Sequence, residues 1–445
     1  MASATNLDLL STRNRGEVHV ENISQEAADR VNHIVHHLLA IYALGATPGE
    51  IQRAYDLNVR YQLPIHENAP KISGDMRDPD IFQTYTGMPK HYKDYLKFFT
   101  HEVCEKGIAA TLNEYLFKND ERANDMLARL YDGLLHSFIH LGYGVEFQQP
   151  LIVVEALAQA AITERWLEDT CDLVTQHKSS HKYSGDPSVL SLYSNLHHDP
   201  VIYSAVRPND PPNKLRDGLI ARAKHAIIPY LAQFTVRPDQ LEKKAAELAN
   251  CSLYVAASAQ RPGKIEMFDF FLMHSVNASI WLSVFLKQEW ISDELKCKLV
   301  ELKGWSDLVT YSACRTPELY PDRALQYQPK QPGDWRSIFR RARCYNDDGH
   351  AAKFIRSIRN IEQISERFAG TAGFPLQQQQ YLTIAHMVMD SVERMNSPDY
   401  SLPPQATFVF GINTEVLRIM FRWVRWNGLD EAWDHVPDIG KTARL

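Results

Sequence analysis

The chain has 445 residues, of which 44% are hydrophobic and 23% charged, with a formal net charge of −6 and an isoelectric point near 6.3. This is the composition of an ordinary globular protein, and it excludes both extensive disorder and a basic nucleic-acid-binding surface. No stretch reaches the roughly 20 apolar residues that a membrane-spanning helix needs, so we expect no membrane partner. A chain of this length is expected to form two or three packed sub-domains.

The N-terminus and the cysteines indicate where the protein works. Residues 1–15 lack the apolar stretch of a secretory signal and contain Asp8 as well as Arg13 and Arg15, which argues against a transit peptide. We expect these residues to be flexible. The six cysteines are far apart and form no Cys-x-x-Cys pair, so reduced thiols are expected. Together these features predict a cytoplasmic protein.

Helical periodicity dominates the rest of the chain. Residues 27–44 carry apolar side chains at spacings of mostly three and four, and Gly45 ends the pattern. Thr47, Pro48 and Glu50 then match the start of a second helix, with a capping residue, a first-turn proline and a capping box. Further helical patterns follow at residues 91–117, 121–141, 151–173, 215–236, 238–254, 268–288, 292–311, 349–366, 377–395 and 414–426. We predict an all-α fold, a multi-helix bundle with at most a minor strand near residues 407–412.

Three regions rich in proline, glycine and aspartate are predicted to be long loops. They are residues 62–88, residues 176–200 together with 207–214, and residues 315–334. We read residues 16–445 as one helical domain, in which the loop-rich region within 176–214 is the candidate boundary between two packed sub-domains. Loops of this length often form lids or the rims of binding sites.

Several enzyme classes leave local motifs that this sequence lacks. Gly142-Tyr143-Gly144 is the nearest match to a dinucleotide fingerprint, but no third glycine follows and no strand precedes it. A Rossmann-bound flavin or nicotinamide is therefore not expected. There is no serine nucleophile elbow, phosphate-binding P-loop or haem attachment motif. His198-Asp199 resembles the dipeptide of helical metal phosphohydrolases, but Pro200 follows at once in a predicted loop, which disfavours that function.

Several of the 18 histidines lie inside apolar helical segments. His136 and His140 share one helix face, as do His350 and Lys353, while His274 lies in a separate apolar helix. Imidazoles from facing helices can gather a zinc, copper or iron ion. A histidine on an apolar face is more often a hydrogen-bonded core residue, and we expect this of some members of the group His36, His37, His140 and His386. Spacing alone does not choose between ligand and core residue.

At these same segments the chain resembles the questin oxidase-like family, which includes fungal polyketide-pathway oxidases described as Baeyer–Villiger-type. The matching motifs are Asn32-His33 with Leu44-Gly45-Ala46, Gly133-Leu134-Leu135-His136 with Gly142-Tyr143-Gly144, Asp269-Phe270-Phe271-Leu272-Met273-His274, and Asp347-Asp348-Gly349-His350-Ala351-Ala352-Lys353. They occur in order over most of the chain. The resemblance implies an all-helical fold and oxidative cleavage of an anthraquinone or a related fused aromatic ketone.

The resemblance also implies a non-haem iron site that uses Fe(2+) and O2, held by histidines and a lysine carboxylated by carbon dioxide. Carried onto this chain, the ligands are His33, His136, His274, His350 and Lys353. His33 fits the Asn-His start of its motif better than the neighbouring His36 and His37. A buried lysine has a depressed pKa, which favours carbamate formation. The alternative for Lys353 is a surface lysine on an amphipathic helix that also carries Arg356 and Arg359.

The resulting hypothesis is an oxygenase that opens a ring of an aromatic polyketide in secondary metabolism, as a monooxygenase or a dioxygenase. NADPH would serve only as a reductant, because no motif binds it. Asp347 and Asp348 would orient His350 or stabilise a helix N-terminus. The aromatic residues that would line an apolar pocket, or belong to the core, are Phe82, Tyr85, Tyr92 and Tyr95. The alternatives are a helical scaffold or small-aromatic-ligand binding protein with structural histidines, and a zinc hydrolase.

Overall fold

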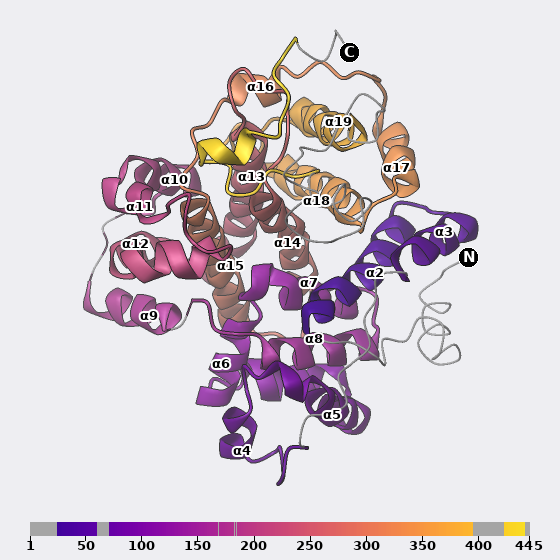
Figure 1. The fold of residues 1–445 in the computed structure, drawn as a ribbon. Helices are drawn as coiled ribbons and strands as arrows, with labels where there is room; N and C mark the ends of the chain where they lie inside the picture. The colour runs from indigo at the N-terminus through magenta and orange to yellow at the C-terminus, as the bar shows by residue number, and fades with distance from the viewer. Residues whose placement is uncertain are drawn as a thin grey trace. The chain divides into compact units, whose positions relative to one another are not determined.

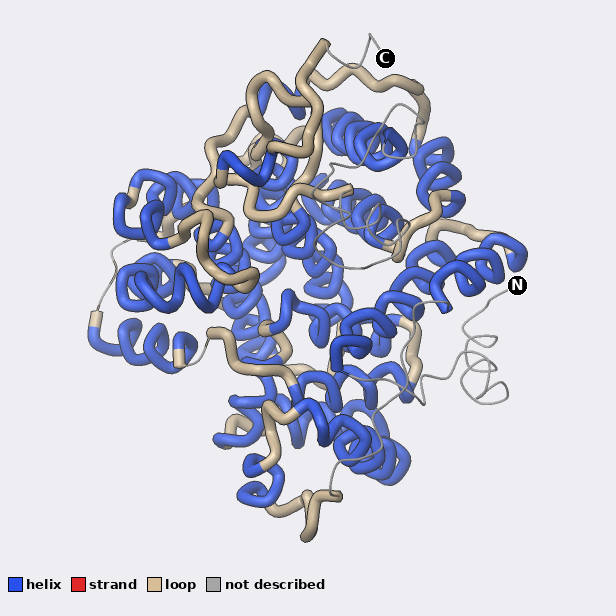
Figure 2. The backbone as a smooth tube through the Cα atoms, viewed as in Figure 1, coloured by secondary structure: helices blue, strands red, loops and turns tan. Residues whose placement is uncertain are grey.

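The fold is described by a computed structural model that covers residues 25–59, 71–167, 169–181, 183, 185–394 and 422–440, with side chains from residue 34 onward. In this part of the chain all regular structure is helical, and the β-structure is limited to two isolated bridges (Figure 2). The predicted all-α fold is confirmed. The predicted flexible N-terminus at 1–15 and the minor strand near 407–412 lie outside the described residues. None of the described helices is long and apolar enough to cross a membrane.

The chain divides into two compact units. The first comprises Met1–Glu168 and Trp281–Leu302, and the second comprises Asp169–Ile280 and Lys303–Leu445. The helices α14 (Phe270–Leu286) and α15 (Asp293–Ala313) contribute residues to both units. The predicted boundary within residues 176–214 remains a prediction.

The first unit is built around two helices that are buried on nearly every side, α7 and α8. A helix that is apolar all round must be covered by neighbours, and here α8 packs against α5, α6 and α7, while α2 packs against α3 and α7 (Figure 1). The helices of this unit are α2 (Gln25–Ala43), α3 (Pro48–Asn58), α4 (Pro79–Thr84), α5 (Tyr92–Leu112), α6 (Glu121–Arg129), α7 (His136–Glu146) and α8 (Pro150–Ile162).

The second unit has α13 at its centre. This helix is buried along almost its whole length and packs against α10, α16 and α18, while α18 also packs against α17 and α19 (Figure 1). The helices of this unit are α9 (Thr170–Ser180), α10 (Val189–His198), α11 (Pro200–Ala205), α12 (Ala221–Gln233), α13 (Leu241–Ser258), α16 (Pro321–Leu325), α17 (Trp335–Cys344), α18 (His350–Ser365) and α19 (Gln378–Arg394).

Most of the predicted helices are confirmed. The segments predicted at 27–44, 238–254, 268–288, 292–311, 349–366 and 377–395 each form a helix whose ends agree to within 4 residues. The capping box is also present: Glu50 N donates to Thr47 Oγ1 at 3.3 Å, and Thr47 N donates to Glu50 Oε2 at 2.6 Å. These are local features, so the sequence alone suffices to predict them.

The predicted continuous helix over residues 121–141 is wrong. It is broken between α6 and α7, where Gly133, Leu134 and Leu135 have φ angles of 58°, 60° and 64°. Three successive left-handed residues interrupt the right-handed helix, although the apolar periodicity continues across the break. The prediction for 151–173 is likewise wrong, because α8 ends at Ile162 and α9 begins at Thr170.

Some predicted loops contain helices. The short α4 lies inside the loop predicted at 62–88, and α16 lies inside the loop predicted at 315–334. The region 176–200 contains the end of α9 and all of α10, which Ser188 caps by accepting a hydrogen bond from Ser191 N. The helix predicted at 414–426 is wrong over residues 422–426, which are non-helical and bridge through Val424 to Asp269; residues 414–421 lie outside the described part.

Candidate metal centre

Two of the predicted ligands face each other inside the second unit. His274 lies one turn into α14 and His350 is the first residue of α18. Their side chains are buried, and their Nε2 atoms are 3.3 Å apart. The left-handed conformation of Gly349, with φ at 88°, lets the chain turn sharply into α18 and places His350 at its start.

The other nitrogen of each ring fixes the tautomer. His274 Nδ1 lies 2.7 Å from the carbonyl oxygen of Phe270, which can only accept, so Nδ1 donates. His350 Nδ1 lies 2.6 Å from Asp348 Oδ1, and the carboxylate likewise accepts. In the neutral rings both Nε2 atoms therefore carry lone pairs that point toward each other. Such an arrangement calls for a proton or a metal cation between them, and a ring oriented by a carboxylate or a carbonyl is typical of a metal ligand.

Lys353 lies one turn after His350 on α18, and its side chain is only 3% exposed. Among the described residues, nothing forms a hydrogen bond to its Nζ atom. Burial lowers the pKa of Lys353 to about 8, although Asp348 and Asp347 act in the opposite direction. The alternative of a surface lysine is therefore wrong. A neutral amine in this position can react with carbon dioxide to give an anionic oxygen ligand.

The two aspartates before His350 have separate functions. Asp348 orients the His350 ring, whereas Asp347 accepts hydrogen bonds from Gly349 N at 2.7 Å and Ala351 N at 2.9 Å. Asp347 therefore satisfies backbone donors at the start of α18. The sequence left open whether these aspartates orient His350 or stabilise the helix N-terminus; Asp348 has the first function and Asp347 the second.

The structure does not test the other two predicted ligands. His136 is buried at the first position of α7, but it belongs to the first unit, and its role as a ligand stays a prediction. His33 lies in α2, and its side chain is outside the described residues.

A family model described as questin oxidase-like matches residues 31–358. The chain belongs to the questin oxidase-like family. All five predicted ligands lie within the matched residues, so the order of the motifs and the family match agree.

Several relatives within the questin oxidase-like family are similar over most of their length. An oxidoreductase named AflY from Aspergillus parasiticus is 40% identical over 98% of this chain and 94% of its own. A questin oxidase from Aspergillus fumigatus is 38% identical over 81% of this chain and 83% of its own. A Baeyer-Villiger oxidase, ptaJ from Pestalotiopsis fici, is 37% identical over 92% of this chain and 88% of its own.

The other buried histidines of this questin oxidase-like chain have hydrogen-bond partners. His36 Nε2 lies 2.9 Å from His140 Nδ1, and His140 Nε2 lies 2.9 Å from Glu155 Oε2, all in the first unit. His37 Nδ1 is 3.2 Å from Asn58 Nδ2, and His386 Nε2 donates to Gly333 O at 2.9 Å. These contacts agree with the expectation of hydrogen-bonded core histidines.

The predicted aromatic residues largely belong to the core. Phe82 and Tyr95 are fully buried and pack edge to face, and the Tyr95 hydroxyl donates to the carbonyl oxygen of Phe82 at 2.6 Å. Tyr85 packs against His91 instead.

The His198-Asp199 dipeptide has a structural function. Asp199 caps α11 by accepting hydrogen bonds from Val201 N and Ile202 N.

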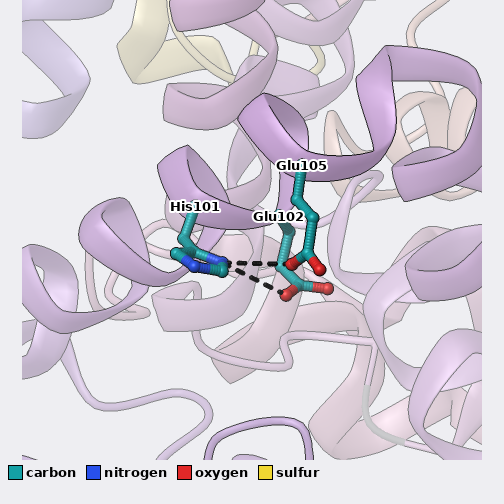
Figure 3. Close-up of side chains that lie close together, drawn as sticks. All are labelled: His101, Glu102 and Glu105. Carbon is teal, nitrogen blue, oxygen red and sulfur yellow. Dashed lines mark ion pairs between the residues drawn. The ribbon is translucent and has the colours of Figure 1, made fainter.

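One further cluster has the composition of a metal site. Among the described residues, one group of three or more histidine, cysteine, aspartate or glutamate side chains has all its ligand atoms within 4.8 Å of one another: His101, Glu102 and Glu105 (Figure 3). Arg77 already pairs with both carboxylates, and Lys106 Nζ lies 2.6 Å from Glu102 Oε2. Burial raises the pKa of Glu102, but hydrogen bonds from Lys106, Tyr115 and Arg77 outweigh it and bring the pKa to about 2. These cations neutralise the cluster, so it needs no metal.

The sequence did not identify the aromatic and cationic residues around the histidine pair. The Phe270 ring lies 4.5 Å from His274 and 5.3 Å from His350 between ring centroids, and Trp423 lies 6.3 Å from His350. Arg425 lies over Phe270, with its Cζ atom 4.2 Å from the ring centroid. Phe270 belongs to a matching motif and could have been chosen, but Trp423 and Arg425 lie in a segment predicted to be helical and carry no local signal.

Proposed function

We propose that this protein is an oxidoreductase, an iron-dependent oxygenase that opens a ring of an aromatic polyketide such as an anthraquinone. The observation that carries the proposal is the pair of buried histidines, His274 and His350, whose Nε2 atoms face each other 3.3 Å apart, with the buried Lys353 one turn after His350 on the same helix. The names of the relatives, questin oxidase and Baeyer-Villiger oxidase, support an oxidative reaction on a ketone-bearing ring.

The donor set fits a non-haem metal ion. Neutral imidazoles bind iron, zinc and copper, and a carboxylated Lys353 would add the anionic oxygen that favours iron. Together with His274 and His350, the family resemblance assigns His33 and His136 to the same ion. When bound, Fe(2+) supplies a centre that activates O2 and stabilises negative charge developing on the substrate.

The chain's own residues prepare this chemistry. Asp348 and the Phe270 carbonyl hold the two imidazoles with their Nε2 lone pairs directed at one point. Burial excludes water and keeps the Lys353 amine neutral from about pH 8 upward, so that it can form a bond to carbon dioxide and release a proton. Oxidation beside the substrate's ketone then yields a ring-opened carboxylic acid or ester. NADPH remains proposed only as an external reductant.

The first test measures bound metal after anaerobic loading with Fe(2+). We expect about one iron per wild-type chain, as for a single built site. We expect His350→Ala to lose the iron and to lower O2 consumption with a hydroxyanthraquinone by at least about 100-fold, because a ligand matters more than the groups that orient it. His386→Ala is the matched control, since His386 is equally buried but hydrogen-bonded to Gly333 O.

Three outcomes would contradict the proposal. Wild-type protein that binds no metal after loading would indicate a helical scaffold or ligand-binding protein. Stoichiometric zinc with hydrolysis that needs no O2 would indicate a zinc hydrolase. Equal iron loss in His350→Ala and His386→Ala would show that both substitutions act on folding rather than on a metal site.

A further inference from the structure

Arg425 is a cation beside the histidine pair, and it forms no ion pair with a carboxylate of the described residues. Its side chain is half-buried and lies over the half-buried ring of Phe270. Within the described part of the chain, no acidic group lies within 4.0 Å of its guanidinium and no hydrogen bond engages it. Burial lowers the pKa of Arg425, while Asp269 and Asp348 act on it in the opposite direction from a distance. The other arginine of the same short segment, Arg422, lies over the Tyr345 ring instead.

The backbone fixes where Arg425 points. Residues 422–427, drawn in yellow in Figure 1, run beside the start of α14: Phe270 N donates to Val424 O at 2.7 Å, and Val424 N donates to Phe268 O at 2.9 Å. Asn427 N donates to Asp269 Oδ2 at 3.0 Å. The position of this segment is therefore set by three hydrogen bonds to the residues that lead into the histidine helix.

Val424 is the single bridge residue of this segment, and the residues around it lie in bends and turns. Val424 is buried in an apolar cluster with Ile265, Met267 and Trp433. Its two neighbours contact the histidine site: the Trp423 ring lies 6.3 Å from the His350 ring between centroids, and Arg425 lies over Phe270. The guanidinium is thus held over the aromatic ring that itself contacts both His274 and His350.

A half-buried guanidinium without a counter-ion costs free energy that an anionic ligand can recover. Arginine presents a planar set of N–H donors that matches a carboxylate or a phenolate, and a guanidinium stacked on a ring leaves its N–H edge available. Phe270 offers the same ligand an aromatic face. An aromatic molecule with an acidic oxygen satisfies both residues at once.

We propose that Arg425 binds an ionised oxygen, phenolate or carboxylate, of the aromatic substrate and holds the substrate against Phe270 beside His274 and His350. This inference rests on the proposed function and narrows its substrate class to aromatic polyketides that carry an acidic oxygen. Arg425 lies outside residues 31–358, the part of the chain that matches the family model.

The test measures ligand binding on protein stripped of metal, so that it does not depend on turnover. Tryptophan fluorescence gives the dissociation constants of a hydroxyanthraquinone, an anthraquinone carboxylate and an uncharged tricyclic ketone. We expect Arg425→Met to weaken binding of at least one anionic ligand tenfold or more, and binding of the neutral ketone less than about twofold, since only the anion loses a charge-assisted hydrogen bond. Arg425→Lys should fall between Arg425→Met and the wild type.

Arg359→Met is the control, because Arg359 also lies over an aromatic ring, Trp335, but is paired with Glu362. An unchanged ratio of anionic to neutral binding in both Arg425 variants would overturn the inference, as would a wild type without preference for an anion. The absorbance of the bound hydroxyanthraquinone adds a second readout, because the wild type should shift it further toward the ionised form than Arg425→Met does. A wild type that prefers the anion but consumes no O2 with iron would contradict the proposed function and leave this inference standing.

Discussion

At the scale of single residues, Asp347 and Asp348 show how neighbours with identical side chains take different functions. Asp347 binds backbone N–H groups at the start of α18, whereas Asp348 binds the ring of His350. The difference follows from where the left-handed Gly349 turns the chain. Lys353, one helical turn further on, lies in the same buried environment without a hydrogen-bond partner in the described structure.

The charge of Lys353 gives a prediction about pH. The folded amine loses its proton near pH 8 and the unfolded amine near pH 10.5, so the unfolded state binds more protons between these values. The free energy of unfolding of the metal-free protein should therefore rise with pH over this range, relative to Lys353→Met. At pH 7 the variant should be more stable, by at most about 3 kcal/mol, because it buries no charge.

Urea denaturation at a series of pH values, in buffer free of carbon dioxide, measures this difference. Lys298→Met serves as the control, because Lys298 Nζ donates to Asn124 Oδ1 at 2.8 Å. If the difference in the free energy of unfolding between wild type and Lys353→Met stayed constant from pH 7 to pH 10.5, the folded amine would titrate as it does in the unfolded chain.

At the scale of elements, two predicted ligands occupy the first position of a helix directly after a left-handed residue. His350 follows Gly349, and His136 follows Leu134 and Leu135. A non-glycine residue in this conformation costs roughly 1–2 kcal/mol, so Leu134 and Leu135 are held in place by their surroundings. The break between α6 and α7 sets the direction in which His136 enters its helix.

Gly133→Ala tests this break. The alanine would have to adopt the left-handed φ of 58°, and its Cβ atom would lie 3.3 Å from Thr163 Cγ2. We therefore expect the free energy of unfolding to fall by about 1–2 kcal/mol. Gly49→Ala is the control: it lies in α3 with nothing within 4 Å and should be neutral or slightly stabilising. Equal effects of the two substitutions in urea denaturation would mean that the turn does not need a left-handed residue.

At the scale of the whole molecule, the second unit contains a charged pair at the centre of its core. Lys303 and Asp307 on α15 are fully buried, and Lys303 Nζ lies 2.6 Å from Asp307 Oδ1. Ser252 of α13 donates to Asp307 Oδ2 at 2.6 Å, and Ser279 of α14 lies 3.4 Å from Lys303 Nζ. Three long helices therefore meet around one polar centre, which fixes how they align.

Removing one member of this pair leaves a buried charge uncompensated. We expect Lys303→Met to lower the free energy of unfolding by about 3–5 kcal/mol, and the double variant Lys303→Met with Asp307→Leu to recover most of the loss. Arg237→Met, which breaks an exposed pair with Asp239, should stay close to wild type in urea denaturation. A double variant as unstable as Lys303→Met would show that apolar packing cannot replace the pair.

Whether a feature can be predicted from the sequence depends on how far apart in the chain the interacting residues lie. The helix start at Thr47 and the helix that carries His274 were predictable, because capping and periodicity involve residues within one or two turns. The break at Gly133 was not, since the apolar spacing continues through it. Likewise the segment that carries Arg425 was predicted to be helical, because it is held through Val424 by hydrogen bonds to Phe268 and Phe270, more than 150 positions away.

The all-α class, the bounds of the helices that carry His274 and His350, and the family resemblance could all be read from the sequence, and the match over residues 31–358 bears out the resemblance. Three features depend on tertiary packing: the Nε2 atoms of His274 and His350 face each other, Lys353 is buried rather than exposed, and Arg425 lies over Phe270. The physical reason is that burial and ring orientation depend on which helices pack together. Periodicity shows which face of a helix is apolar, but it does not show which partner covers that face.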